Sequence, residues 1–197
     1  PHYMLKEIHE QPRAVAQTLE ERVAGGKLLE AAFGPAAQTV FAKTEAVRIV
    51  ACGTSYHAAS VAKYFIEQIC RLPCWVEIAS EYRYRNPVVP KNTLFVSVSQ
   101  SGETADTLAA LRMAKQAGYL SQLAICNVPE SSLVRESELV LLTRAGPEIG
   151  VASTKAFTTQ LVALFLLTLV LAKQRGKLTP EREHELLVQL RHLPAAL

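Results

Sequence analysis

Closely paired cysteines are missing from this sequence, and their absence excludes the protein classes that depend on them. The four cysteines, Cys52, Cys70, Cys74 and Cys126, form neither the paired spacings of a zinc site nor a CxxC redox motif. Three of them lie beside apolar runs, where a free thiol behaves as a small hydrophobic side chain. We therefore expect free thiols in a reducing, cytoplasmic compartment, with no metal and no cofactor.

A concentrated basic face is also absent. The formal net charge is only +3, and only Arg83, Arg85 and Lys91 come near to clustering. Nucleic-acid binding needs a dense basic surface, whereas these three residues are typical of a solvated edge. We expect no nucleic-acid partner.

The sequence lacks both a signal-peptide core and an apolar run of transmembrane length. The N-terminal stretch PHYMLKEIHEQ has no apolar centre. The stretch Leu161–Ala172, LVALFLLTLVLA, is strongly apolar but too short for a bilayer, which needs about 20 residues. We interpret it as a buried or interface helix and expect no membrane partner.

Short apolar segments that alternate with helical patterns dominate the rest of the chain. The five strand candidates are VRIVACG, CWVEIA, TLFVSVS, QLAICN and ELVLLT. Strands that alternate with helices predict βαβ units and a parallel sheet, and nearly continuous apolar strands indicate that both faces are covered. We predict an α/β fold: a three-layer αβα sandwich with a five-stranded parallel, flavodoxin-like sheet of order 2-1-3-4-5 and extra helices at both ends.

The chain divides into two parts that we expect to form a single globular domain. Residues 1–45 contain three helical stretches, Tyr3–Gln11, Pro12–Val23 and Pro35–Lys43, and we expect this N-terminal helical segment to pack on the core. Residues 46–197 contain the strands. A chain of 197 residues is long enough for one well-filled core.

Two hydroxyl-rich loops follow the first and third predicted strands. Strand 1 ends in ACGTSYH, which contains Thr54 and Ser55, and strand 3 ends in SQSGET. Ligands of open parallel sheets bind outside the carboxyl ends of the strands, where the winding reverses. In the order 2-1-3-4-5 this point lies between strands 1 and 3, so the two loops are predicted to face one crevice.

The SQSGET loop has the composition of a phosphate site. A helix start has about four unpaired N–H groups and carries roughly half a positive charge, and a glycine allows an anion to approach closely. The hydroxyls of Ser99, Ser101 and Thr104 can donate to phosphate oxygens, and Gln100 suits a sugar hydroxyl. The alternative is that Ser101 simply caps the helix that follows. Glu103 would compete with a phosphate, so we expect its carboxylate to point aside.

Other chemistries are weaker interpretations. SxSGxT also resembles the flavodoxin phosphate loop, but that loop follows the first strand and is accompanied by aromatic residues, so FMN remains a minor alternative. In a third loop, GPEIGVASTKAF, either Ser153 or Thr154 is expected to cap the long helix. Glu148 or Lys155 could act as acid, base or electrophile there, although a lysine of this type is more often solvated or capping. His57 has no visible carboxylate partner and is expected to be an ordinary helix residue.

Five stretches together resemble a known family. ACGTSYHAA, EIASEYRYR, SVSQSGETADTLAALR, LAICNVPESSLVRESE and EIGVASTKAFTTQL resemble, in order and spacing, the first sugar-isomerase (SIS) subdomain of the glutamine–fructose-6-phosphate aminotransferases. The resemblance extends from about His2 to Leu193. SQSGET alone indicates only the wider SIS superfamily, whereas EIGVASTKAFTTQ is more specific. The resemblance implies a part in making glucosamine 6-phosphate from fructose 6-phosphate and glutamine.

The resemblance also implies which residues bind the substrate. They lie in the three loops, where SQSGET would hold the phosphate and the other two loops would make further contacts to the sugar phosphate. The implied residues are Ser99, Gln100, Ser101, Thr104, Thr54, Ser55, Val151 and Ser153.

No catalytic residue of the family maps onto this chain. The Schiff-base lysine, the enolisation glutamate and the ring-opening histidine belong to parts of the family's enzyme that this sequence does not match, and Lys155 is not the Schiff-base lysine. The implied partners are a glutaminase domain, a second SIS subdomain and a second copy of the chain in a homodimer. A SIS sugar-phosphate sensor and a compact SIS phosphosugar isomerase are the alternatives.

Overall fold

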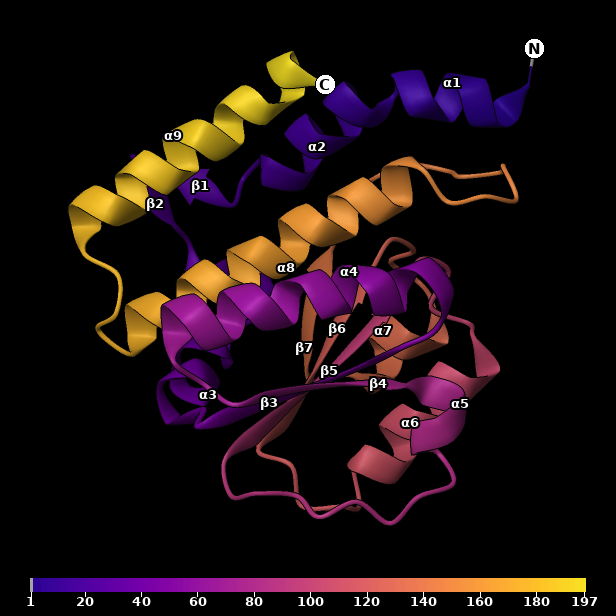
Figure 1. Ribbon diagram of the computed structural model, residues 1–197, viewed down its shortest axis with the longest axis vertical. Coiled ribbons are helices and arrows are strands. Elements are labelled where there is room, and N and C mark those ends of the chain that lie inside the picture. The colour runs from indigo at the N-terminus through magenta and orange to yellow at the C-terminus, as the bar shows by residue number, and fades with distance from the viewer. Residues whose placement is uncertain (1) are drawn as a thin grey trace.

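A computed structural model describes residues 2–197; Pro1, the first residue of the expected segment 1–45, lies outside the described residues. A five-stranded parallel sheet forms the centre of the molecule (Figure 1). Its strands are β3 (Ala46–Ala51), β4 (Cys74–Ile78), β5 (Thr93–Ser99), β6 (Ser121–Cys126) and β7 (Leu139–Leu142), in the spatial order β4-β3-β5-β6-β7. Numbered along the chain, this is the predicted order 2-1-3-4-5.

Helices cover both faces of the sheet, which confirms the three layers. One face carries α4 (Gly53–Phe65) and α8 (Lys155–Gln174), and the other carries α5 (Ala79–Tyr82), α6 (Ala105–Ala114) and α7 (Ser132–Glu136) (Figure 1). The remaining helices, α1 (Tyr3–His9), α2 (Gln11–Leu19), α3 (Ala37–Lys43) and α9 (Pro180–Ala196), come from the two ends of the chain.

The alternation of side chains along the strands produces this layering. Every residue of β3 and β5 is buried. In β5, Leu94, Val96 and Val98 pack into the cluster beneath α4 and α8, whereas Phe95 packs into the cluster beneath α6. Because successive strand residues point to opposite faces, an apolar strand can supply two cores at once.

The long apolar helix α8 has 20 residues and is long and apolar enough to cross a membrane by length and composition. The apolar run Leu161–Ala172 lies within this helix, and Lys155–Gln160 precede the run at the start of the helix. However, 78 % of its most apolar window is buried inside the fold. Since α2, α3 and α4 pack around it, its apolar surface is used in the core.

Several short elements differ from the sequence predictions. The segment expected to be helical also contains a hairpin of β1 (Val23–Ala24) and β2 (Lys27–Leu28), in which Gly25 and Gly26 form the turn at φ 58° and 72°. A 3-10 turn (Glu30–Phe33) follows it, a π-helical turn (Ile66–Cys70) extends α4, and α5 begins at Ala79, the last residue of the predicted strand CWVEIA. Turns this short have no periodicity that a sequence pattern could reveal.

Candidate functional site

The carboxyl edge of the sheet brings the predicted loops to the point where the winding reverses. β3 and β5 are neighbours in parallel register, with Ala51 opposite Val98. The helix after β3 covers one face and the helix after β5 covers the other. The loops that follow these two strands therefore start side by side, as the predicted strand order requires.

Hydrogen bonds between residues close in sequence organise the SQSGET loop from within. Ser99 is 3 % exposed, and its Oγ accepts the N–H of Gly102 at 3.0 Å and lies 3.4 Å from Thr104 Oγ1. The Oγ of Ser101 accepts the N–H of Glu103 at 3.2 Å. A hydroxyl that accepts one N–H keeps its own proton to donate, so each serine can still bind an anion.

Gly102 cannot be replaced by a larger residue without a rearrangement. Its φ is +69°, and a Cβ at this position would lie 2.5 Å from Ser131 Cβ and 2.8 Å from Cys126 Sγ. The glycine therefore lets the loop lie directly against the end of β6 and the start of α7. This close packing sets the path of the backbone just before α6.

The start of α6 carries no side-chain cap. The helix begins at Ala105, with Thr104 in the N-cap position and no hydrogen bond from a capping side chain. Ser101 bonds to the N–H of Glu103, which precedes the helix, so the interpretation of Ser101 as a simple helix cap is wrong. An uncapped helix start presents N–H groups and a positive partial charge to a ligand.

Glu103 points away from this helix start, as expected. Its Oε1 accepts the N–H of Ser132 at 2.7 Å, at the first residue of α7. This hydrogen bond from the Ser132 backbone, together with one from the Ser132 side chain, lowers the pKa of the Glu103 carboxyl below its ordinary value. The carboxylate therefore stabilises the start of the neighbouring helix α7.

The first loop opens α4 in a similar way. Gly53 adopts φ +57° at the start of the helix, and Cys52 precedes it as an N-cap residue without a side-chain hydrogen bond. Thr54 is exposed and Ser55 is buried. Between this loop and SQSGET, residues 2–197 form no hydrogen bond, so only the adjacency of β3 and β5 brings the two loops together.

The third loop differs from its prediction in two respects. Thr154 occupies the N-cap position of α8 without a side-chain cap, and Glu148 does the capping: its Oε1 accepts the N–H groups of Thr154 at 2.9 Å and Ala156 at 3.1 Å. Lys155 is 3 % exposed and pairs with Glu10 at 2.6 Å, so it is neither solvated nor capping. Because both charged groups are engaged, neither faces the site as a free acid, base or electrophile.

The two implied sugar contacts of this loop lie in different environments. Val151 is fully exposed, and Ser153 is half-buried with its hydroxyl donating to Glu148 Oε2 at 3.2 Å. A contact that Val151 makes through its backbone would be open to solvent and ligand. The hydroxyl of Ser153 already has an acceptor within the loop.

Asn127 links the second and third loops, and the sequence reasoning missed it. Its N–H donates to the carbonyl of Gln100 at 3.2 Å, and its Nδ2 donates to the carbonyl of Gly146 at 2.8 Å. Its Oδ1 accepts the N–H of Ala145 at 2.7 Å. An asparagine directly after a buried strand was the available signal, since polar residues at the carboxyl end of a parallel strand face the site.

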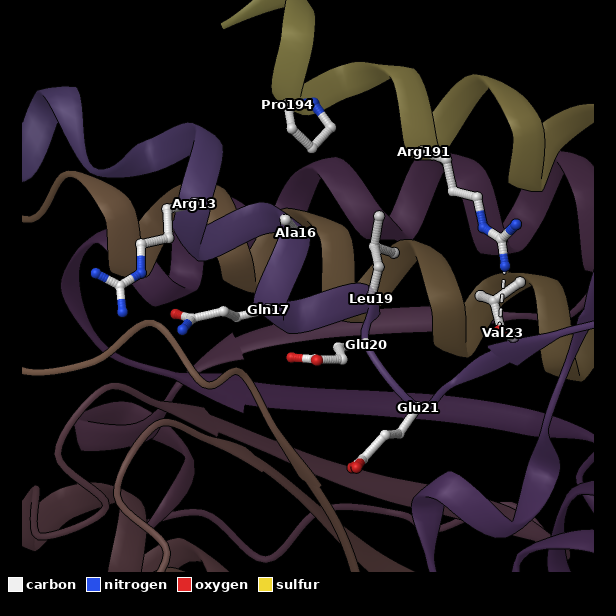
Figure 2. Close-up of a pocket in the computed structure, with 9 residues that line it drawn as sticks. All are labelled: Arg13, Ala16, Gln17, Leu19, Glu20, Glu21, Val23, Arg191 and Pro194. Atoms are coloured by element: carbon white, nitrogen blue, oxygen red, sulfur yellow. Dashed lines mark hydrogen bonds between the residues drawn. The ribbon is translucent and has the colours of Figure 1, made fainter.

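One pocket of the described chain lies away from the three loops. A pocket of about 530 Å³ lies between α2 and α9, lined by residues that include Arg13 and Gln17 from α2, Glu20 just after it and Pro194 from α9 (Figure 2). In the same view Arg191 donates to the carbonyl of Val23 at 3.1 Å. None of its lining residues belongs to the three loops, so this pocket is separate from the predicted site.

The four cysteines are free thiols, as the sequence predicted. Burial raises the pKa of both Cys70 and Cys74 to about 12. A thiol with such a pKa is protonated at neutral pH and is a poor nucleophile. The described residues also contain no cluster of three or more His, Cys, Asp or Glu side chains that could hold a metal ion.

The fold and the loops together define a parallel α/β domain with hydroxyl-rich loops at the carboxyl edge of its sheet. Comparison with known proteins gives its family. The SIS domain matches residues 41–170, about two thirds of the chain, and the chain therefore belongs to the SIS domain family.

Its relatives agree with the resemblance expected from the sequence. Proteins named glutamine–fructose-6-phosphate aminotransferase [isomerizing] from Pseudomonas syringae pv. tomato and Pseudomonas putida are each 64 % identical to the chain over 196 residues. The match covers 100 % of the chain but 32 % of each relative, so the chain spans about a third of their length.

Solved structures extend this agreement to three dimensions. The C-terminal domain of glucosamine-fructose-6-phosphate aminotransferase from Francisella tularensis superposes with a TM-score of 0.97 at 54 % identity, over 99 % of the chain and 55 % of that structure. Glucosamine-6-phosphate deaminase from Thermotoga maritima superposes with a TM-score of 0.72 at 26 % identity, over 98 % of the chain and 54 % of that structure.

Proposed function

We propose that this chain is the sugar-phosphate-binding part of a glutamine–fructose-6-phosphate aminotransferase. Such an enzyme would convert fructose 6-phosphate and glutamine into glucosamine 6-phosphate and glutamate. The single observation that carries the proposal is the SQSGET loop at the winding reversal, where two serine hydroxyls and Gly102 precede a helix start without a side-chain cap. The names of the relatives supply the particular substrates.

Different loops would contact different parts of the substrate. The phosphate would lie against SQSGET, because the start of α6 offers N–H groups and the loop offers hydroxyls. The first and third loops would contact the rest of the open-chain ketose. The proposed contacts are Ser99, Gln100, Ser101 and Thr104 in the second loop, Thr54 and Ser55 in the first, and Val151 and Ser153 in the third.

This chain would orient the ketose, and other parts of the enzyme would supply the acid–base groups. Holding the substrate by its phosphate fixes C1 and C2 relative to those groups, which is how orientation lowers a barrier. Imine formation at C2 and proton transfer between C2 and C1 would then complete the isomerisation. Ammonia released from glutamine would supply the nitrogen.

The proposed partners follow from the length of the relatives. A glutaminase domain and a second SIS subdomain would complete the enzyme, since the chain spans 32 % of the relatives. We further propose a homodimer in the cytoplasm. Residues 1–45 and 46–197 would form one unit, because α2 packs on both α8 and α9.

Thermal unfolding with fructose 6-phosphate, glucosamine 6-phosphate, inorganic phosphate and FMN tests the phosphate site. A ligand at a hundred times its dissociation constant adds about 2.7 kcal/mol, which raises the Tm of a chain of this size by roughly 5–10 °C. We expect a rise with the hexose phosphates and with phosphate, but not with FMN. Ser101→Ala and Thr104→Ala should abolish it, whereas Thr39→Ala, an exposed hydroxyl on α3, should not.

Two outcomes would contradict the proposal. A rise that survives both loop substitutions would place the ligand elsewhere, and no rise with any phosphate would leave SQSGET without an anion role in this chain. Turnover of a sugar phosphate without glutamine or ammonia would instead support a compact phosphosugar isomerase.

A further inference from the structure

A carboxylate from the N-terminal helix α1 holds the backbone of the third loop. Glu7 Oε1 accepts the N–H of Ile149 at 2.6 Å and the N–H of Gly150 at 3.1 Å, and Oε2 lies 3.2 Å from the Gly150 nitrogen. Glu7 is 3 % exposed, so water competes little for these bonds. Hydrogen bonds to a charged acceptor are stronger than those between neutral groups.

Gly150 is the residue that permits this close approach. A Cβ at position 150 would lie 2.6 Å from Glu7 Oε2 and 3.5 Å from the backbone of Met4. The loop therefore packs closely on α1 at this glycine. A larger residue at 150 would force the loop and the helix apart.

Glu7 is also what anchors α1. It is the buried residue of this helix, whereas Tyr3, Met4 and Leu5 are largely exposed. A helix that buries little apolar surface gains little from packing. The position of the helix and that of the loop therefore depend on the same carboxylate.

Further hydrogen bonds and an ion pair hold the rest of the third loop. At its base Glu148 accepts the first N–H groups of α8, and just beyond it the buried Lys155 pairs with Glu10. Glu7 holds the segment between these points, immediately before Val151. Ile149 and Val151 are exposed there and have no apolar packing that could set their position.

We propose that Glu7 is a positioning residue for the sugar-contacting loop. It would hold the backbone of Ile149 and Gly150 so that Val151 and Ser153 are presented to the ketose before the ligand arrives. This inference rests on the proposed function, because it takes the third loop as a contact to the sugar. It predicts a selective effect: without Glu7, the loop would have to be ordered on binding, while the SQSGET loop would hold phosphate as before.

The test compares two ligands and three variants by isothermal titration calorimetry on this chain. In Glu7→Gln, one N–H of the loop would meet an amide NH2 in place of a carboxylate oxygen. We expect affinity for fructose 6-phosphate to fall about tenfold and affinity for inorganic phosphate to stay within twofold. Gly150→Ala should give the same selective loss through the Cβ contact. Glu45→Gln, at an exposed glutamate between α3 and β3, should change the affinity for neither ligand.

Amide hydrogen exchange supplies a readout that needs no ligand. In Glu7→Gln, the amides of Ile149 and Gly150 should exchange at least tenfold faster than in the original chain, while those of Gly102 and Glu103 should not change. Restored protection in Glu7→Asp would show that the carboxylate itself is required. Unchanged exchange at Ile149 and Gly150 would overturn the proposal whatever the binding data show.

The outcomes also separate this proposal from the proposed function. If the original chain binds both ligands and Glu7→Gln weakens both equally, the positioning role fails and the phosphate site stands. If the original chain binds neither ligand, the proposed function fails for this chain, and the positioning role that rests on it fails as well.

Discussion

The SQSGET loop and the third loop differ in where most of their side-chain hydrogen bonds come from. Inside the SQSGET loop these bonds join residues two to five positions apart, such as Ser99 with Gly102 and Ser101 with Glu103. Longer-range bonds from Asn127 and Ser132 add to them. The third loop is held by Glu7, 142 residues from Ile149, and its flanking Lys155 by Glu10, 145 residues away. The local hydrogen bonds of the SQSGET loop can be recognised from a motif. The bonds from Glu7 and Glu10 to the third loop form only once the N-terminal helices have docked.

The largest loss of stability should come from changing Gly102, where the SQSGET loop packs directly against Ser131. Gly102→Ala combines a positive φ with a Cβ only 2.5 Å from Ser131 Cβ. We expect a loss of about 2–5 kcal/mol in the free energy of unfolding, measured by urea denaturation. Gly118→Ala is the matched control, since it has φ +83° but no atom within 4 Å, and should cost only about 1–2 kcal/mol. Equal losses in the two variants would show that packing against α7 is unimportant.

A smaller effect should follow from breaking the ion pair between Lys155 of α8 and Glu10, which lies between α1 and α2. Glu10→Gln leaves the buried ammonium of Lys155 without its carboxylate, whereas Lys155→Met removes the buried charge altogether. Breaking one side of a buried ion pair costs more than replacing the charge with an apolar group, although here the exposure of Glu10 reduces the difference. We expect Glu10→Gln to lower the Tm by several degrees and Lys155→Met to lower it less. The reverse order, measured by circular dichroism, would contradict the assignment of Glu10 as the partner.

The smallest effect should appear in how steeply the free energy of unfolding falls at acidic pH. The pKa of Glu103 is lowered in the folded chain by the N–H of Ser132, and that of Glu10 is lowered by Lys155. A carboxyl with a depressed folded pKa stabilises the fold above its unfolded value of 4.5, and this contribution is lost as the pH falls through the folded pKa. Urea midpoints from pH 6 to pH 3 should therefore fall less steeply in Glu103→Gln than in the original chain. Parallel profiles would show that Glu103 does not bond to α7.

The sheet could be predicted from the sequence because its determinants are local. Apolar runs such as TLFVSVS mark strands, and five strands alternating with helices leave few plausible orders. The SQSGET loop was predictable for the same reason. The prediction that the Glu103 carboxylate points aside was also confirmed, although its partner, the N–H of Ser132 at the start of α7, lies 29 residues further along the chain.

The predictions from sequence fail where residues far apart in the chain come into contact. Glu148 caps α8 from six residues upstream of Thr154, beyond the reach of the usual capping pattern. Lys155 is buried beside Glu10, which comes from the junction of α1 and α2, and no property of the lysine itself indicates this partner. Asn127 and Glu7 had no local signature of their bonding partners, so their roles became visible only in three dimensions.

The most direct test of the account places this chain in a complete enzyme. Residues 2–197 would replace the matching third of the Pseudomonas putida relative, and formation of glucosamine 6-phosphate from fructose 6-phosphate and glutamine would be followed. We predict that the chimera is active and that Ser101→Ala and Thr104→Ala each raise the KM for fructose 6-phosphate at least tenfold, with Thr39→Ala unchanged. A folded chimera that forms no product, or loop variants with an unaltered KM, would contradict the assignment of SQSGET as the phosphate site of an aminotransferase.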